Sequence, residues 1–164
     1  MNKRLPNNYI FECLAAFILL IIIDQSTKIF IAKLMFNNMF ESIGLLPFLN
    51  IVFVRNTGIS FGLFSDGGLL NRYFFTSFSI IIGSILLFVS LVTKEKFMRL
   101  SLLMISGGAI GNALDRIYFG GVIDFIDFFI YNFHWPAFNF ADIFITLGVI
   151  ILFFENIFGK VRND

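Results

Sequence analysis

The segment Leu100–Tyr118 reads LSLLMISGGAIGNALDRIY, an apolar run that carries Asn112, Asp115 and Arg116 near its second end. A helix needs about 20 mainly apolar residues to cross the roughly 30 Å hydrocarbon core of a membrane, and this run is close to that length. Charged side chains near hydrocarbon are costly, so those found there are candidate functional residues by default. The segment therefore predicts a transmembrane helix with a polar site at one end.

Three other segments predict spans of the same kind, at about 10–35, 70–92 and 141–158. Of the 164 residues, 58% are hydrophobic and 14% are charged, with a mean hydropathy of +0.88. Soluble domains have about 45–50% apolar and about 25% charged residues. We expect one integral membrane domain over 1–164, built as a four-transmembrane-helix bundle. The first span has no small-residue cleavage site after it, so we interpret it as a retained helix rather than a signal peptide.

Basic residues predict the orientation, because cytoplasmic loops are enriched in Lys and Arg. They gather at three places that four spans bring to one face: Lys3 and Arg4; Lys94, Lys96 and Arg99; Lys160 and Arg162. Both termini are then cytoplasmic, and two longer connections face outward. The first, about 37–68, is rich in β-branched and aromatic residues and predicts a small outward-facing β-sheet. The second is dense in aromatic residues, and a short interfacial helix is expected near 124–131.

Two aspartates at the outward end form the candidate catalytic pair. Asp124 lies in the second connection, and Asp142 begins the last span, three residues after Asn139. Two close carboxylates do not both ionise easily, so they share a proton and can perform acid–base chemistry on a water molecule. Asp115 remains an alternative to Asp124, whereas Asp127 is expected to face solvent. Helix capping by Asn139 and a favourable helix dipole at Asp142 are the structural alternatives.

Other polar residues of the spans have structural explanations as well. Gly108, Asn112 and Asp115 share one helical face, and their alternative role is close helix packing with Asn112 as a hydrogen-bonding contact. Asp24 and Lys28 are an i, i+4 pair that is typical of a buried contact holding a bundle together.

Several function classes are weakly supported by the sequence. The net charge of +1 gives no electrostatic case for nucleic-acid binding. Cys13 fits a small apolar side chain, His134 fits the membrane interface, and no zinc-peptidase or serine-nucleophile motif is present. A small transporter or proton-translocating protein using intramembrane Asp, Lys and Arg remains an alternative. Polar groups at one membrane level argue against a conduit, and a non-enzymatic assembly factor is the third alternative.

Five motifs together resemble the lipoprotein signal peptidases (signal peptidase II). They are Asp24-Gln-Ser-Thr-Lys28, Asn56-Thr-Gly58, Gly107-Gly-Ala-Ile-Gly-Asn112-Ala-Leu-Asp115-Arg116, Val122-Ile-Asp124-Phe and Phe138-Asn139-Phe-Ala141-Asp142. The resemblance implies a four-helix membrane bundle with an outward β-cradle and a short interfacial helix. It also implies an aspartyl endopeptidase of the bacterial inner membrane, with its active site near the outer face.

The resemblance further implies the substrate, the inhibitor and the residue roles. The substrate would be a prolipoprotein carrying a diacylglyceryl cysteine, cleaved on the amino side of that lipobox cysteine. No metal or organic cofactor is expected, membrane lipid and a cyclic peptide inhibitor of the globomycin type are expected partners, and a monomer is expected. Asp124 and Asp142 would be catalytic. The implied substrate-binding residues are Asn56, Gly108, Asn112, Arg116 and Asn139, and the implied structural polar residues are Asp24, Lys28 and Asp115.

Overall fold

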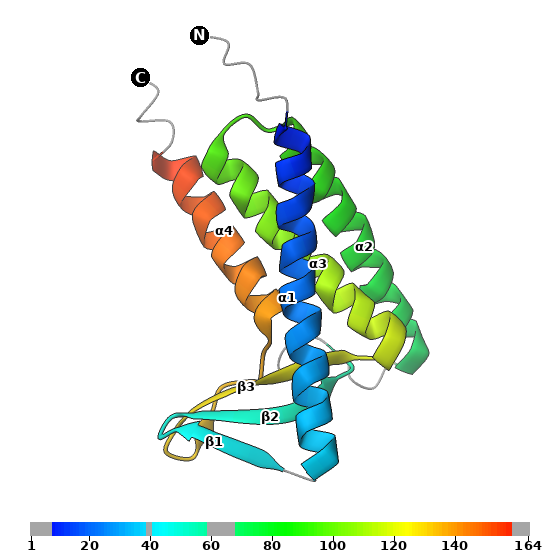
Figure 1. The fold of residues 1–164 in the computed structure, drawn as a ribbon, viewed down its shortest axis with the longest axis vertical. Helices are drawn as coiled ribbons and strands as arrows, with labels where there is room; N and C mark the ends of the chain where they lie inside the picture. Colours follow the sequence, from blue (N-terminus) through cyan, green and yellow to red (C-terminus); the bar gives the residue numbers. More distant parts are fainter. Residues whose placement is uncertain (1–7, 39–40, 59–67, 159–164) are drawn as a thin grey trace.

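Four long helices form the body of the protein in a computed structural model that describes residues 8–38, 41–58 and 68–158 (Figure 1). They are α1 (Tyr9–Asn38), α2 (Gly68–Val92), α3 (Lys96–Phe119) and α4 (Phe140–Phe158). Each is long and apolar enough to cross a membrane. The predicted four-helix membrane bundle is confirmed.

Helix α3 is the central element, because it packs against each of the other three helices. In its most apolar stretch 50% of the residues are buried, against 11% in each of the other helices, so α1, α2 and α4 present most of their apolar side chains outward. That arrangement suits a bundle surrounded by lipid, where no water-exposed polar face is needed. Glycines permit the close helix contacts: Gly108 faces the backbone of Ala141 on α4, and Gly148 of α4 faces the backbone of Ser101 on α3.

A four-stranded antiparallel sheet lies at one end of the bundle (Figure 1). Its strands, in spatial order, are β1 (Ser42–Leu46), β2 (Leu49–Asn56), β3 (Val122–Ile130) and β4 (Phe133–His134). Strand β2 pairs with β3 from Asn56↔Val122 to Leu49↔Phe128. The predicted small sheet is confirmed, but half of its strands come from the second connection rather than from 37–68.

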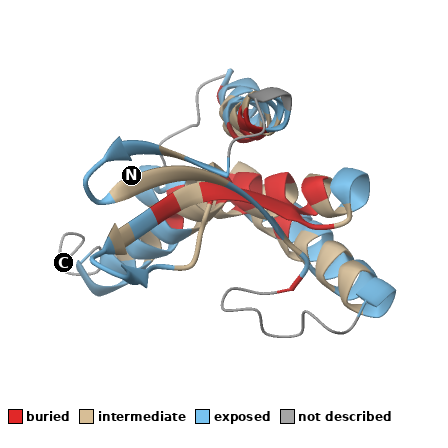
Figure 2. Ribbon diagram, turned by 90° about the horizontal axis from the view of Figure 1, so that it is seen from below, coloured by how far each residue is buried: buried red, intermediate tan, exposed pale blue. Residues whose placement is uncertain are grey.

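The expectation of an interfacial helix near 124–131 is wrong, because Val122–Ile130 form strand β3. Its sequence, VIDFIDFFI, is rich in β-branched and aromatic residues, and β2 offers it an antiparallel partner from Val122 to Phe128, with one irregularity in register. Gly120, at a φ of 76°, ends α3 and turns the chain into the sheet. Figure 2 shows the buried first half of this strand lying across the base of the bundle.

Candidate active site

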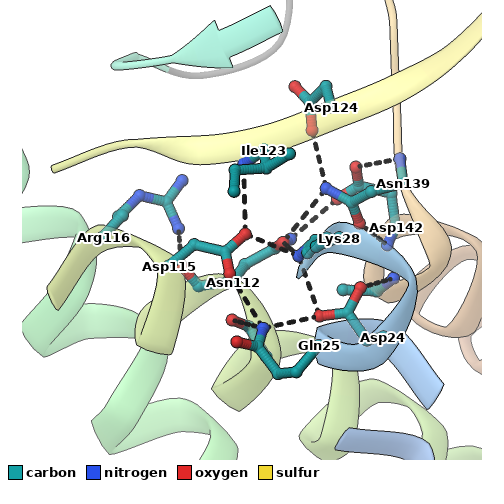
Figure 3. A network of polar contacts seen from close by, with 12 residues as sticks. Asp24, Gln25, Lys28, Asn112, Asp115, Arg116, Ile123, Asp124, Asn139 and Asp142 are labelled. Carbon is teal, nitrogen blue, oxygen red and sulfur yellow. Dashed lines mark hydrogen bonds and ion pairs between the residues drawn. The ribbon is translucent and has the colours of Figure 1, made fainter. Parts of the chain in front are cut away.

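Asp124 and Asp142 are brought together where strand β3 passes the start of helix α4 (Figure 3). Asn139 connects them directly. Its Nδ2 donates to Asp124 Oδ1 at 2.7 Å, and its backbone N–H donates to Asp142 Oδ2 at 3.2 Å. A backbone bridge between Ile126 and Phe138 places the two segments side by side. The candidate pair predicted from the sequence therefore forms one cluster.

Asp142 lies in the first turn of α4 and has a capping arrangement with Asn139. The Asp142 N–H donates to Asn139 Oδ1 at 3.0 Å, while the Asn139 N–H returns a bond to the Asp142 carboxylate. This reciprocal pattern satisfies backbone donors at a helix start, where the helix dipole also favours a negative charge. Asn112 of α3 adds a third bond, from Nδ2 to Asp142 Oδ1 at 2.8 Å. The same hydrogen bonds therefore cap helix α4 and hold the Asp142 carboxylate in place.

Asp124 is almost fully enclosed, with 2% of its surface exposed. Burial away from water, followed by the negative charge of Asp142, raises the pKa of Asp124 from 3.8 to about 7. Hydrogen bonds from Asn56 Nδ2, at 3.1 Å, and from Asn139 act in the opposite direction on this pKa. A carboxyl group with this pKa holds a proton for part of the time at neutral pH, which is what a general acid requires.

A cavity of about 730 Å³ opens onto both aspartates. Its polar end contains Asn56, Asn112 and Arg116 together with the two carboxylates. Its apolar walls come from α2, α3 and α4, through Phe78, Ser79, Ile82, Ile105, Ala109, Ile143, Ile145, Thr146 and Leu147. The site thus has an apolar groove along the helices and acid–base groups at the end nearest the sheet.

An ion network lies behind the cavity. Lys28 Nζ is 2.8 Å from Asp24 Oδ2 and 2.8 Å from Asp115 Oδ2, and all three side chains are fully buried. The i, i+4 pair of Asp24 and Lys28 was expected, whereas the contact with Asp115 was not. Gln25 also belongs to this network, since its Nε2 donates to Asp115 Oδ1 at 2.8 Å. The only signal for Gln25 in the sequence is its place beside Asp24.

Two predicted substrate-binding residues do not line the cavity. Gly108 packs against α4, where a Cβ would come 2.4 Å from the Ala141 carbonyl oxygen. Asn139 is fully buried behind the two aspartates, which it supports. Trp135 lines the cavity although no motif indicated it.

The expectation that Asp127 faces solvent is wrong, because only 7% of its surface is exposed. Its carboxylate lies 2.9 Å from His134 Nδ1 and accepts a bond from Asn50 Nδ2 at 3.2 Å. These contacts join β2, β3 and β4 away from the cavity. Among the described residues, no three His, Cys, Asp or Glu side chains are grouped as metal ligands.

Comparisons with known proteins identify the family and the fold. Residues 16–158 match the family model described as signal peptidase (SPase) II. The chain is 36% identical to a lipoprotein signal peptidase of Cupriavidus pinatubonensis over 99% of this chain and 91% of that one. It is 39% identical to the Pelagibacter ubique lipoprotein signal peptidase over 100% of this chain and 99% of that one.

A solved structure of a bacterial membrane enzyme has the same fold. It superposes with a TM-score of 0.76 at 32% sequence identity, covering 93% of this chain and 91% of the other. Motifs, fold and relatives agree over nearly the whole length. The chain therefore belongs to the signal peptidase II family of bacterial membrane peptidases.

Proposed function

We propose that this peptidase removes signal peptides from diacylglyceryl-modified prolipoproteins by means of an aspartate dyad, Asp124 and Asp142. It cleaves on the amino side of the lipidated cysteine. The observation that carries this proposal is the meeting of two carboxyl groups, one with a pKa near 7, at the polar end of an apolar groove.

The groove fits the chemistry of a signal peptide, which contains a run of apolar residues. Its walls on α2 and α4 stand on either side of α3, and their side chains at the cavity are mainly apolar. A helical apolar segment lying in this groove would bring the bond that follows it to the two aspartates. The acyl chains of the substrate would remain in the surrounding lipid, where apolar helices already lie.

The division of roles follows from the surroundings of each carboxyl group. Asp142 accepts a proton from a water molecule, whose oxygen attacks the carbonyl carbon of the scissile bond. Asp124 donates its proton to the developing oxyanion. When the tetrahedral intermediate collapses, the C–N bond breaks and the leaving amine takes up the proton held by Asp142, while one hydroxyl of the gem-diol returns its proton to Asp124 as the carbonyl re-forms. Asn56 and Arg116 line the same cavity and orient the substrate backbone.

The orientation follows from the positions of the basic residues. The connection between α2 and α3, which carries Lys94 and leads into Lys96 at the start of α3, lies at the end of the bundle opposite the sheet (Figure 1). The positive-inside rule then places both termini in the cytoplasm and the dyad near the outer face of the inner membrane. The protein acts there as a monomer, since one chain supplies the whole dyad. A cyclic peptide of the globomycin type would occupy the same groove.

The test uses purified protein in detergent and an authentic diacylglyceryl prolipoprotein. Wild type should cut before the lipidated cysteine, while Asp124→Asn and Asp142→Asn should lose cleavage and remain folded. Asp127→Asn is the matched control, because Asp127 lies on the same strand as Asp124 but outside the cavity. This variant should still cleave the substrate. Cleavage near the wild-type rate by either dyad variant contradicts the proposed mechanism.

A further inference from the structure

Each dyad aspartate follows a residue whose backbone N–H is held by a buried carboxylate. The Ala141 N–H, just before Asp142, donates to Asp24 Oδ1 at 2.9 Å. The Ile123 N–H, just before Asp124, donates to Asp115 Oδ2 at 3.1 Å. The two segments that carry the dyad therefore each have their own anchoring carboxylate.

Lys28 connects the two anchors. Its Nζ lies 2.8 Å from Asp24 Oδ2 and 2.8 Å from Asp115 Oδ2, with no exposed surface on any of the three side chains. Gln25 makes a second connection, because its Nε2 donates to Asp24 Oδ2 at 3.1 Å and to Asp115 Oδ1 at 2.8 Å. Figure 3 shows this bridge beneath the dyad, running from α1 to α3.

We propose that Asp24, Lys28 and Asp115 form a positioning bridge that sets the spacing between the two carboxyl groups of the dyad. Asp24 positions Asp142, Asp115 positions Asp124, and Lys28 holds the two anchors at a fixed separation. The inference rests on the proposed function, because it takes Asp124 and Asp142 as the reacting pair.

Lys28 also fixes the orientation of Asn112. Its Nζ donates to Asn112 Oδ1 at 3.0 Å, and the Asn139 amide donates to the same oxygen at 3.3 Å. With both donors on its oxygen, the Asn112 amide must turn its Nδ2 toward Asp142, to which it donates at 2.8 Å. The bridge thus acts on Asp142 through a side chain as well as through the backbone.

Stability alone is a poor explanation for three buried charges. Replacing buried ion pairs with apolar side chains of similar volume is often neutral or stabilising, because charges lose their hydration on burial. An ion pair does, however, hold two groups at a defined distance. Strand β3 belongs to the sheet and Asp142 belongs to a helix of the bundle, so their spacing needs such a link in addition to the Ile126–Phe138 bridge.

The first test lengthens each anchor while retaining its charge, in Asp24→Glu and Asp115→Glu. One extra C–C bond displaces the anchored backbone by up to about 1.5 Å. Misplacement on the order of 1 Å costs about 10²-fold in rate, so we expect kcat on the lipidated substrate to fall about 10²-fold while KM changes little. Tyr9→Phe is the control: its hydroxyl donates to the Ser90 and Thr93 carbonyls on α2 and in the α2–α3 connection, so kcat should be unchanged.

The second test preserves the charge of the network and measures the pH profile. The charged groups facing the dyad are Asp24 and Lys28 on α1 and Asp115 and Arg116 on α3. Asp24, Lys28 and Asp115 together carry a net charge of −1, and Lys28→Arg keeps that charge while lengthening the link between the two anchors. Lengthening the bridge reduces the mutual repulsion of the dyad, so the upper apparent pKa in the kcat/KM profile should fall.

The outcomes separate the two levels of the proposal. Lower kcat in the Glu variants, or the shifted pH profile in Lys28→Arg if the Glu variants fail to fold, supports the bridge. Normal kcat and an unchanged pH profile in folded variants overturn it, even where their melting temperatures fall. If Asp124→Asn or Asp142→Asn keeps near-wild-type activity, the dyad itself is wrong.

Discussion

Gly108 offers a direct measurement of how closely α4 must approach α3. A Cβ at this position would lie 2.4 Å from the Ala141 carbonyl oxygen and 2.7 Å from Ile145 Cγ1. An ordinary contact begins near 3.4 Å, so Gly108→Ala requires a separation larger by about 1.0 Å at the residue that precedes Asp142. Overpacking of this kind costs about 1–3 kcal/mol of folding free energy.

The same shift should affect catalysis more than binding. Moving the Asp142 carboxylate by about 1 Å relative to Asp124 should lower kcat about 10²-fold. The groove walls on α2 and α3 remain in place and only the α4 wall moves, by about 1 Å, so KM for the lipidated substrate should change by less than about threefold.

Gly107→Ala is the matched control on the adjacent residue. Its Cβ would meet only the Leu20 side chain, at 3.1 Å, so a shift of about 0.3 Å is sufficient and a flexible side chain can make it. The assay is single-turnover cleavage of purified variants, with melting temperatures measured on the same samples. Equal kcat for Gly108→Ala and Gly107→Ala in folded protein would refute the reasoning.

Three more predictions concern other parts of the molecule. Because burial raises the pKa of Asp124 to about 7, the folded protein binds more protons than the unfolded chain between pH 4 and 7, so its stability should decrease as pH rises through this range. Asp124→Asn should flatten that slope in thermal unfolding, and an unchanged slope would assign it to another group. Trp135 is the single tryptophan, so in proteoliposomes its fluorescence should be quenched by lipids brominated near the glycerol and only weakly by aqueous iodide. The reverse pattern would remove this part of the site from the bilayer edge. Arg72 donates to the Arg116 and Ile117 carbonyls at the end of α3, each at 2.7 Å, so Arg72→Ala should reduce stability by about 1 kcal/mol. Its kcat should stay within about twofold, and a large loss of kcat without a loss of stability would point to direct participation in the site.

The sequence predicted those parts of the structure that depend on local patterns. The spans follow from apolar length, and the Asp24–Lys28 pair follows from helical spacing. The pairing of β2 with β3 joins residues such as Asn56 and Val122, and no local periodicity reports a contact at that separation. Aromatic residues suit both an interfacial helix and a strand, which explains the wrong expectation for 124–131.

The candidate site was predictable as a set of residues but not as a network. Motif positions indicated Asp115 and Asp24 as structural polar residues, yet nothing in the sequence connected them to Ile123 and Ala141. Those bonds involve backbone N–H groups, which every residue except proline carries, so residue identity contains no signal for them. The burial of Asp127 was missed for a related reason, because its partner His134 lies across a hairpin that the sequence did not predict.

The charges of the site are consistent with the shared proton of the proposed mechanism. Four carboxyl groups, Asp24, Asp115, Asp124 and Asp142, face two cations, Lys28 and Arg116. Asp24 and Asp115 both pair with Lys28. The side-chain hydrogen bonds to the carboxylates of Asp124 and Asp142 therefore come from the neutral amides of Asn56, Asn112 and Asn139. Burial and the negative charge of Asp142 raise the pKa of Asp124 to about 7, and the hydrogen bonds from Asn56 and Asn139 only partly offset that rise. A lysine in place of Asn56 would supply the missing charge, lower this pKa and remove the general acid at neutral pH. Under the proposed mechanism, the asparagines around the dyad therefore serve the chemistry as well as the packing.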